Sequence, residues 1–208
     1  MSDRQDVGDD DAGRAAALWR ELTAWLAEHA PASAACLRPG AGEEALARVE
    51  ARMGFALDAG LREVWAVNDG VADDDDSGAG LFLDRHALLP VATAADIHDD
   101  LCDSFSEEWG RLWLPLTTNE VNEPWMGSTI DCGSGRLGAW SMEDAPEEPG
   151  GMSFVDLLAA VVEAVKDGRG ALMPSPGRSG TVPGLADGAL VWQDPGEVLV
   201  ANWAPLRY

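Results

Sequence analysis

The spacing of apolar residues changes twice along this chain, and this change constrains the fold more than any other sequence feature. Between residues 15 and 67, apolar side chains recur every three to four positions, which predicts amphipathic helices. From 81 to 142, apolar residues come in short runs separated by Gly, Asp and Pro, which predicts strands joined by turns. Helical spacing returns over residues 153–168. Adjacent short strands flanked by helices favour an α+β fold over a doubly wound parallel sheet.

Residues typical of helix ends support these boundaries. Gly54 and Gly168 each follow an apolar stripe and favour the left-handed conformation that ends a helix. Asp58 can cap a helix, and Ser153 followed by Asp156 resembles a capping box. We therefore expect helices over about residues 15–29, 42–53, 59–67 and 153–168.

The sequence predicts N-terminal helices and a closing helix packed on a mainly antiparallel sheet of about five to six strands, because strands joined by tight turns pair antiparallel. The clearest hairpin covers residues 125–142, with its turn at Gly133, Ser134 and Gly135. Residues 1–13 are charged and polar, so we expect a disordered acidic tail. Residues 14–168 then form one domain.

Residues 169–208 form a C-terminal extension that is rich in Gly and Pro. It contains two apolar runs, residues 189–192 and 198–203, on either side of a turn at Asp194, Pro195 and Gly196. We expect these two runs to pair as a hairpin.

Negative charge dominates the composition. The chain has 37 Asp and Glu against 14 Lys and Arg, which gives a net charge of −23. Such a protein repels nucleic acids and anionic membranes and attracts basic protein surfaces. Solubility and adaptation to high salt are alternative reasons for this charge. The acidic residues concentrate in residues 1–11, 73–76, 96–108 and 143–148.

The cysteines and the apolar runs indicate a cytoplasmic protein. Cys36, Cys102 and Cys132 are odd in number and far apart, so we expect reduced thiols rather than disulfides. The apolar run at 157–162 is too short to span a bilayer, and residues 1–11 lack the apolar stretch of a secretory signal.

Catalytic and cofactor motifs are missing from the sequence. It contains no phosphate-binding loop with Lys, no Gly-x-Ser-x-Gly elbow and no His-Glu-x-x-His zinc motif. We therefore predict a protein that is not an enzyme and holds no cofactor or metal. His98 and Cys102 would share one helix face, which leaves a metal or catalytic site as an alternative to simple packing.

A second alternative concerns the four consecutive aspartates at positions 73–76. Clustered carboxylates suit calcium, but their spacing does not follow the calcium-binding loop of EF-hands. We therefore favour a solvated loop.

Exposed tryptophans beside acidic loops are the best candidates for contact with a protein partner, because Trp is enriched in binding hot spots. Two tryptophans flank the predicted hairpin, and two acidic loops flank the predicted strands. The candidate binding residues are Asp73, Asp74, Asp75, Asp76, Trp125, Trp140, Glu143, Asp144, Glu147 and Glu148.

Five pieces in a fixed order, the first made of residues 42–57 and 61–70, resemble the SUKH superfamily, also named Smi/Knr after fungal cell-wall assembly regulators. They include a helix pair that ends at Asn68-Asp69-Gly70 and a Trp-Leu-Pro-Leu strand. The segments are residues 42–57, 61–70, 81–91, 113–116, 130–138 and 153–165. The stretch 118–123 and the extension after 170 depart from the family's pattern.

The resemblance implies a compact α+β fold and a function in protein binding. Bacterial members of the family are commonly immunity proteins that bind and neutralise a toxin delivered by competing cells. The resemblance therefore implies a partner with a basic toxin domain, which an acidic inhibitor would attract. The alternative is a regulatory or scaffold module with a housekeeping partner, as in fungal members.

Overall fold

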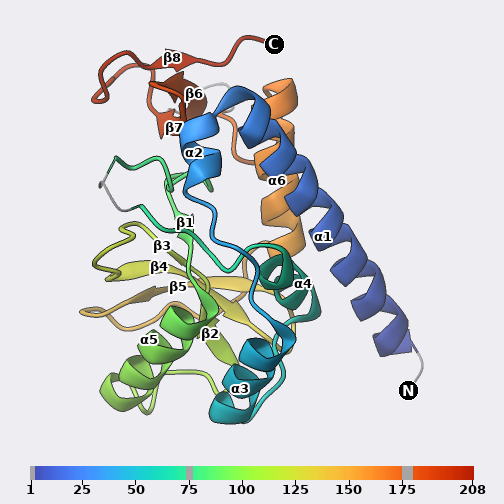
Figure 1. Ribbon diagram of the computed structural model, residues 1–208. Helices are drawn as coiled ribbons and strands as arrows, with labels where there is room; N and C mark the ends of the chain where they lie inside the picture. The colour runs from blue at the N-terminus through green and yellow to red at the C-terminus, as the bar shows by residue number, and fades with distance from the viewer. Residues whose placement is uncertain (1–2, 74–76, 175–179) are drawn as a thin grey trace.

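The computed structural model describes residues 3–73, 77–174 and 180–208, with side chains from Asp10 onward, and it has an α+β fold (Figure 1). The helices are α1 (Asp3–His29), α2 (Pro31–Ala35), α3 (Glu43–Met53), α4 (Ala59–Val67), α5 (Val91–Ser104) and α6 (Phe154–Asp167). The strands are β1 (Ala87–Leu88), β2 (Trp113–Pro115), β3 (Thr117–Thr118), β4 (Met126–Asp131), β5 (Leu137–Ser141), β6 (Val182–Ala186), β7 (Ala189–Gln193) and β8 (Ala204–Pro205).

The predicted helix ends are confirmed. Asp58 Oδ1 accepts a hydrogen bond from the Leu61 N–H at 3.0 Å, which caps α4. Ser153 and Asp156 form a reciprocal capping box at the start of α6. Gly54 and Gly168 follow α3 and α6 with φ of 76° and 64°. Local signals therefore fix these three helices at the positions where the sequence predicts them.

All strand pairs are antiparallel, as predicted, but the expected single sheet of five to six strands is wrong. The strands divide into three small sheets, with the orders β1-β3, β2-β4-β5 and β7-β6-β8. A proline explains the shortness of the first sheet. The Leu89 N–H donates to the Leu116 carbonyl at 3.0 Å, and Pro90 follows without an N–H to continue the pairing.

The N-terminus differs from the expected disordered tail, because α1 begins at Asp3. Ala15 is fully buried, and the helix crosses α4 at Gly60, where an added Cβ would lie 3.0 Å from the Ala15 Cβ and 3.7 Å from the Asp11 carbonyl oxygen. Packing on α4 thus reaches Asp11.

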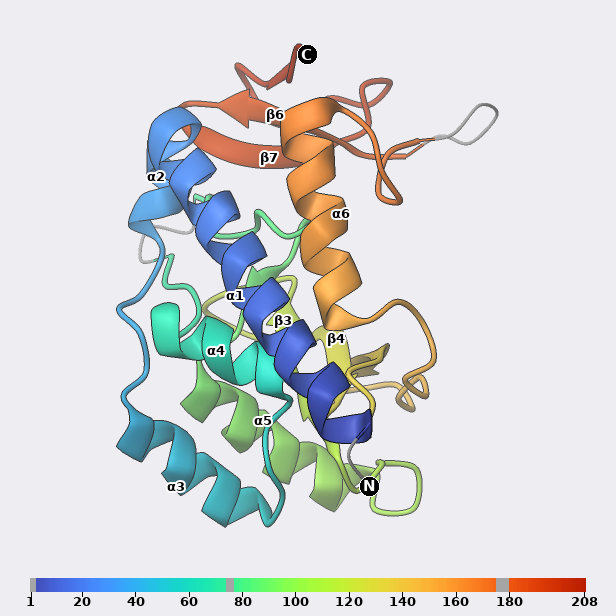
Figure 2. The same cartoon turned by 90° about the vertical axis from the view of Figure 1, so that its right-hand side faces the viewer.

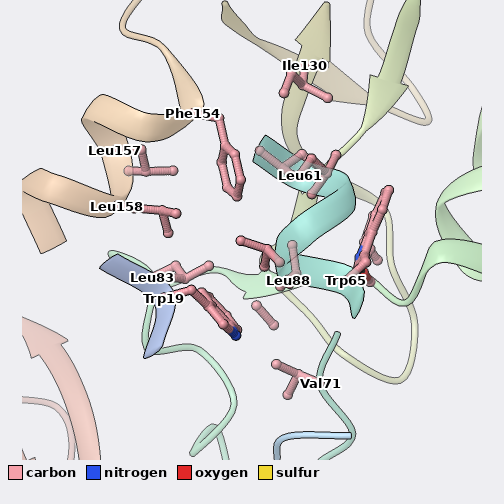
Figure 3. Packing of buried hydrophobic residues seen from close by; sticks show 14 of the residues in the cluster. Trp19, Leu61, Trp65, Val71, Leu83, Leu88, Ile130, Phe154, Leu157 and Leu158 are labelled. Atoms are coloured by element: carbon pink, nitrogen blue, oxygen red, sulfur yellow. The ribbon is translucent and has the colours of Figure 1, made fainter. Parts of the chain in front are cut away.

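The core lies between the helices α1, α4 and α6 and the central sheet β2-β4-β5. Figure 2 shows α1 and α6 side by side along the length of the molecule. Trp19 from α1, Leu61 from α4 and Phe154 from α6 meet in this core, each at most 1% exposed (Figure 3). Ile130 from β4 closes the cluster on the sheet side.

Buried tryptophans also connect segments that are far apart in the sequence, because each indole N–H finds an acceptor outside its own element. The three backbone acceptors lie in segments with few ladder hydrogen bonds. The bonds run from Trp65 to the Leu89 carbonyl (2.9 Å), from Trp140 to the Thr117 carbonyl (3.0 Å), from Trp192 to the Phe82 carbonyl (2.9 Å) and from Trp19 to Asn68 Oδ1 (3.0 Å).

The C-terminal extension contains a hairpin, but the predicted pairing of residues 189–192 with 198–203 is wrong. Strand β7 pairs instead with β6, through a two-residue turn in which Asp187 and Gly188 have φ of 49° and 83°. Asp-Gly is a strong signal for such turns. Residues 198–203, the expected second strand, form a loop instead. Gln193 Oε1 accepts hydrogen bonds from the N–H groups of Leu199 and Val200 in this loop.

The extension packs against the body of the protein. The Leu190 N–H donates to Ser33 Oγ at 2.9 Å, and the Ala32 N–H donates to the Gly188 carbonyl at 2.9 Å. These bonds dock the β6–β7 hairpin on α2, beside the upper end of α6 (Figure 1).

We predict that Gly127→Ala destabilises the protein by about 3 kcal/mol, because a Cβ at this position would lie 1.9 Å from the Thr117 carbonyl oxygen. Gly13→Ala is the matched control: its Cβ meets nothing within 4 Å, and Ala is the better helix former. Urea unfolding of both variants measures the difference. Equal stabilities would contradict the close approach of β3 to β4.

Candidate protein-binding surface

The open end of the β4–β5 hairpin presents two large apolar side chains to solvent. Trp125 and Met142 lie directly opposite each other, and the Met142 N–H donates to the Trp125 carbonyl at 2.9 Å. Opposite residues of an antiparallel pair point to the same side of the sheet. Trp125 is 42% exposed and Met142 is 38% exposed, so the two form one apolar patch.

Acidic side chains surround this patch. Glu123 precedes Trp125, and Glu143 and Asp144 follow Met142; all three are exposed. Ser141 Oγ accepts hydrogen bonds from the N–H groups of Glu143 (3.1 Å) and Asp144 (3.2 Å), which fixes the first turn of the acidic loop. We call the group Trp125, Met142, Glu123, Glu143 and Asp144 the Trp125 face.

The second half of the acidic loop covers the outer edge of β5. The Glu147 N–H donates to the Ala139 carbonyl at 3.0 Å, and the N–H groups of Gly150 and Gly151 donate to the Leu137 carbonyl at 3.2 and 3.1 Å. These bonds hold Glu147 and its neighbour Glu148 at the sheet edge with both side chains exposed.

Several cations of the described residues pair with carboxylates elsewhere on the protein. Arg52 of α3 binds Asp96 (2.7 Å) and Asp99 (2.6 Å) of α5, Arg48 pairs with Glu44 at 2.8 Å, and Lys166 pairs with Glu21. In the part of the chain that the structure describes, no ion pair involves the acidic residues of the Trp125 face or of residues 147–148. Their charge is therefore left uncompensated beside the apolar patch.

The prediction that Trp140 contacts a partner is wrong. Its side chain is 1% exposed, lies opposite Gly127, and donates its indole N–H to the Thr117 carbonyl. Trp140 and Trp125 lie on the same side of the hairpin. Strand β3 covers Trp140, whereas the chain turns away after Asn119, whose N–H donates to the Met126 carbonyl at 3.1 Å, and leaves Trp125 uncovered.

Asp73 is also a wrong prediction, because it is 3% exposed. Its carboxylate accepts hydrogen bonds from the N–H of Ser77 (3.1 Å), the hydroxyl of Ser77 (3.0 Å) and the N–H of Gly80 (3.4 Å). Asp73 therefore organises its own loop instead of facing a partner or a cation. Asp74, Asp75 and Asp76 lie outside the described residues.

Sequence reasoning missed two residues of this surface, Met142 and Glu123. For Met142 the available signal was the hairpin register: with the turn at Gly135, continued pairing places Met142 opposite Trp125. Two large apolar residues opposite each other at the open end of a hairpin, next to an acidic loop, indicate an exposed pair.

His98 and Cys102 share one face of α5, as their spacing predicts, and Cys102 Sγ lies 3.5 Å from His98 Nε2. His98 Nδ1 accepts the indole N–H of Trp109 at 3.2 Å. Burial lowers the pKa of His98 and raises the pKa of the Cys102 thiol, so both groups favour their neutral forms. The two side chains form a packing contact, and the His98 ring also packs against Phe55 in a T-shaped arrangement.

Two further thiols complete the cysteine set. Cys36 donates to the Ala32 carbonyl at 3.4 Å, and burial raises the pKa of Cys132 to about 12. Cys102 and Cys132 are free thiols. Among the described residues, no group of three His, Cys, Asp or Glu side chains is arranged to hold a metal ion.

No family model matches the chain, and no curated protein matches it. Within the described residues, no helix combines the length and the apolar character needed to cross a membrane.

We predict that His98 makes the protein less stable in acid. Its pKa in the folded protein lies below the ordinary value of 6.5, so the unfolded chain takes up a proton that the folded chain resists. Stability is therefore fully present above about pH 6.5 and falls as the pH drops toward the folded pKa, by at most about 1.4 kcal/mol per pH unit.

The variant His98→Asn tests this, because Asn can accept the Trp109 N–H but takes up no proton. Urea unfolding between about pH 7.5 and about pH 5 should give a shallower loss of stability for the variant than for the parent protein. The two proteins have the same acidic residues, so the difference between their pH profiles reports His98. Parallel pH profiles would contradict the role of His98.

Proposed function

We propose that this protein is a binding module that holds a basic protein partner against the Trp125 face. The single observation that carries the proposal is the exposed pair of Trp125 and Met142 beside carboxylates that have no cation partner among the described residues. The proposal assigns no catalytic step to the chain.

The composition of the Trp125 face supports this function. Aromatic residues and Met are enriched at the centres of protein interfaces, where a few large side chains supply most of the binding free energy. The surrounding carboxylates attract a basic partner at a distance and orient it before contact. An apolar centre with a charged rim therefore suits a protein surface better than a small molecule.

The resemblance to SUKH domains supports a more specific role for the same face. On this basis we infer that the partner is a toxin with a basic surface and that binding neutralises it. A cytoplasmic location accompanies this proposal, because Cys102 and Cys132 are free thiols and disulfides are rare in that compartment. A regulatory module is the alternative function, and the identity of the neighbouring gene separates the two.

The test is a titration of the purified protein with the product of the adjacent gene. Trp125→Ala should weaken binding at least tenfold, which is about 1.4 kcal/mol, because truncating a central aromatic anchor removes its buried area. Leu199→Ala is the matched control, since Leu199 is 82% exposed but lies on the C-terminal extension. We expect it to leave the affinity unchanged.

Salt provides the second readout of this titration. Binding should weaken as the ionic strength rises, mainly through a slower association rate, because screening removes the attraction between the carboxylates and the basic partner. No binding at micromolar concentrations would refute the toxin-neutralising role with this partner. Binding that Trp125→Ala leaves unchanged would refute the Trp125 face as the contact surface.

A further inference from the structure

A groove of about 380 Å³ lies between β5, the start of α6 and the turn that precedes β1. It is separate from the Trp125 face but adjoins the same acidic loop, which runs from Met142 at one surface to Glu147 and Glu148 at the other. The side chains that matter for its chemistry are Leu137, Leu157, Leu172, Asp84, Glu147 and Glu148.

Part of the floor of the groove is apolar. Leu137 belongs to β5 and Leu157 to α6. Each is 9% exposed because its side chain packs in the core cluster. Leu172, which follows α6, packs against the same cluster. Ala139 leaves space above this floor because its side chain is small.

The rim is acidic, and backbone hydrogen bonds hold it in place. The Glu147 N–H is bound to the Ala139 carbonyl, and Gly138 has no room for a side chain because an added Cβ would lie 2.4 Å from the Glu147 carbonyl oxygen. On the opposite side, Asp84 has a φ of 50°, and its carboxylate accepts the Thr181 hydroxyl at 3.2 Å. Glu147 and Glu148 have no ion pair among the described residues.

We infer that this groove takes an arginine side chain of the partner protein. The apolar floor fits the aliphatic stem of arginine, and the carboxylates of Glu147 and Glu148 meet its charged end. The inference rests on the proposed function, because it assigns a second anchor on the same partner.

The chemistry of the groove disfavours the other classes of occupant. Three carboxylates on the rim repel phosphates and acidic peptides. An apolar side chain alone would leave these carboxylates unpaired beside it. Lysine offers a strongly hydrated point charge, whereas guanidinium is planar, weakly hydrated and able to bind two carboxylate oxygens at once. The volume lies near the lower end of the range of about 300–1,000 Å³ for ligand pockets, which suits one side chain rather than a folded element.

The first experiment needs no partner protein. N-acetyl-arginine amide at millimolar concentration should shift the backbone NMR signals of Gly138, Ala139 and Met152 in the full-length protein. N-acetyl-citrulline amide, which has the same shape without the charge, should leave them unchanged. Equal shifts from both compounds, or arginine shifts that lie outside the groove, would overturn the inference.

A matched pair of double variants localises the effect. E147Q/E148Q and E143Q/D144N remove the same charge from the same loop, but only the first pair lines the groove. E147Q/E148Q should abolish the shifts caused by arginine, and E143Q/D144N should retain them. Loss of the shifts in both variants would mean that the acidic loop as a whole attracts the arginine compound. This result would overturn the groove as the binding site.

The partner titration connects the groove to the proposed function. Ala139→Leu fills the space above the floor without changing charge and should weaken partner binding at least tenfold, with the NMR spectrum confirming the fold. Partner binding that survives both Ala139→Leu and E147Q/E148Q would overturn the groove and leave the Trp125 face standing. Arginine binding in the groove without any partner binding would instead refute the proposed function alone.

Discussion

The need of each buried indole N–H for an acceptor determines how the irregular part of this fold is held. Between α4 and α5, the described residues include only the two-residue strand β1, so ladder hydrogen bonds are too few to position this segment. Trp65 binds the Leu89 carbonyl from the helical side, and Trp192 binds the Phe82 carbonyl from the C-terminal extension. An unpaired buried N–H or carbonyl destabilises a protein by about 1–3 kcal/mol, so these contacts fix the segment from both sides.

The same requirement sets the limits of the proposed binding surface. Trp140 reaches the Thr117 carbonyl only because Gly127 lets β3 approach β4 closely. Strand β3 ends one residue later, at Thr118, and the side of the hairpin that it covers becomes open at Trp125 and Met142. The buried and the exposed tryptophan are thus two consequences of one short covering strand, and the apolar patch begins at the point where the cover ends.

This geometry explains which features the sequence could predict. Caps such as Ser153 with Asp156 act through neighbouring residues, so local patterns located α6 and its ends correctly. Trp125 and Trp140 have the same side-chain direction in the hairpin, and only the distant strand β3 distinguishes them, so the sequence could not separate core from surface. The burial of Asp73 could not be predicted either. Its carboxylate accepts hydrogen bonds from Ser77 and Gly80 of its own loop, and no periodic pattern in the sequence indicates such a loop. The β6–β7 hairpin was predictable from Asp187-Gly188, because Asp-Gly is a stronger signal for a two-residue hairpin turn than Asp194 to Gly196.

The distribution of charge, rather than its total, determines what the acidic residues can do. Ion pairs such as Arg52 with Asp96 and Asp99 neutralise carboxylates along α3 and α5. Screening at physiological salt limits the remaining field to about 8 Å, so only carboxylates close to a partner affect the bound state. In the proposed complex, the carboxylates near Trp125 and over β5 would meet this condition, but exposed ion pairs contribute at most about 1 kcal/mol each. The proposed affinity would therefore come from apolar burial, and the carboxylates would select a basic partner.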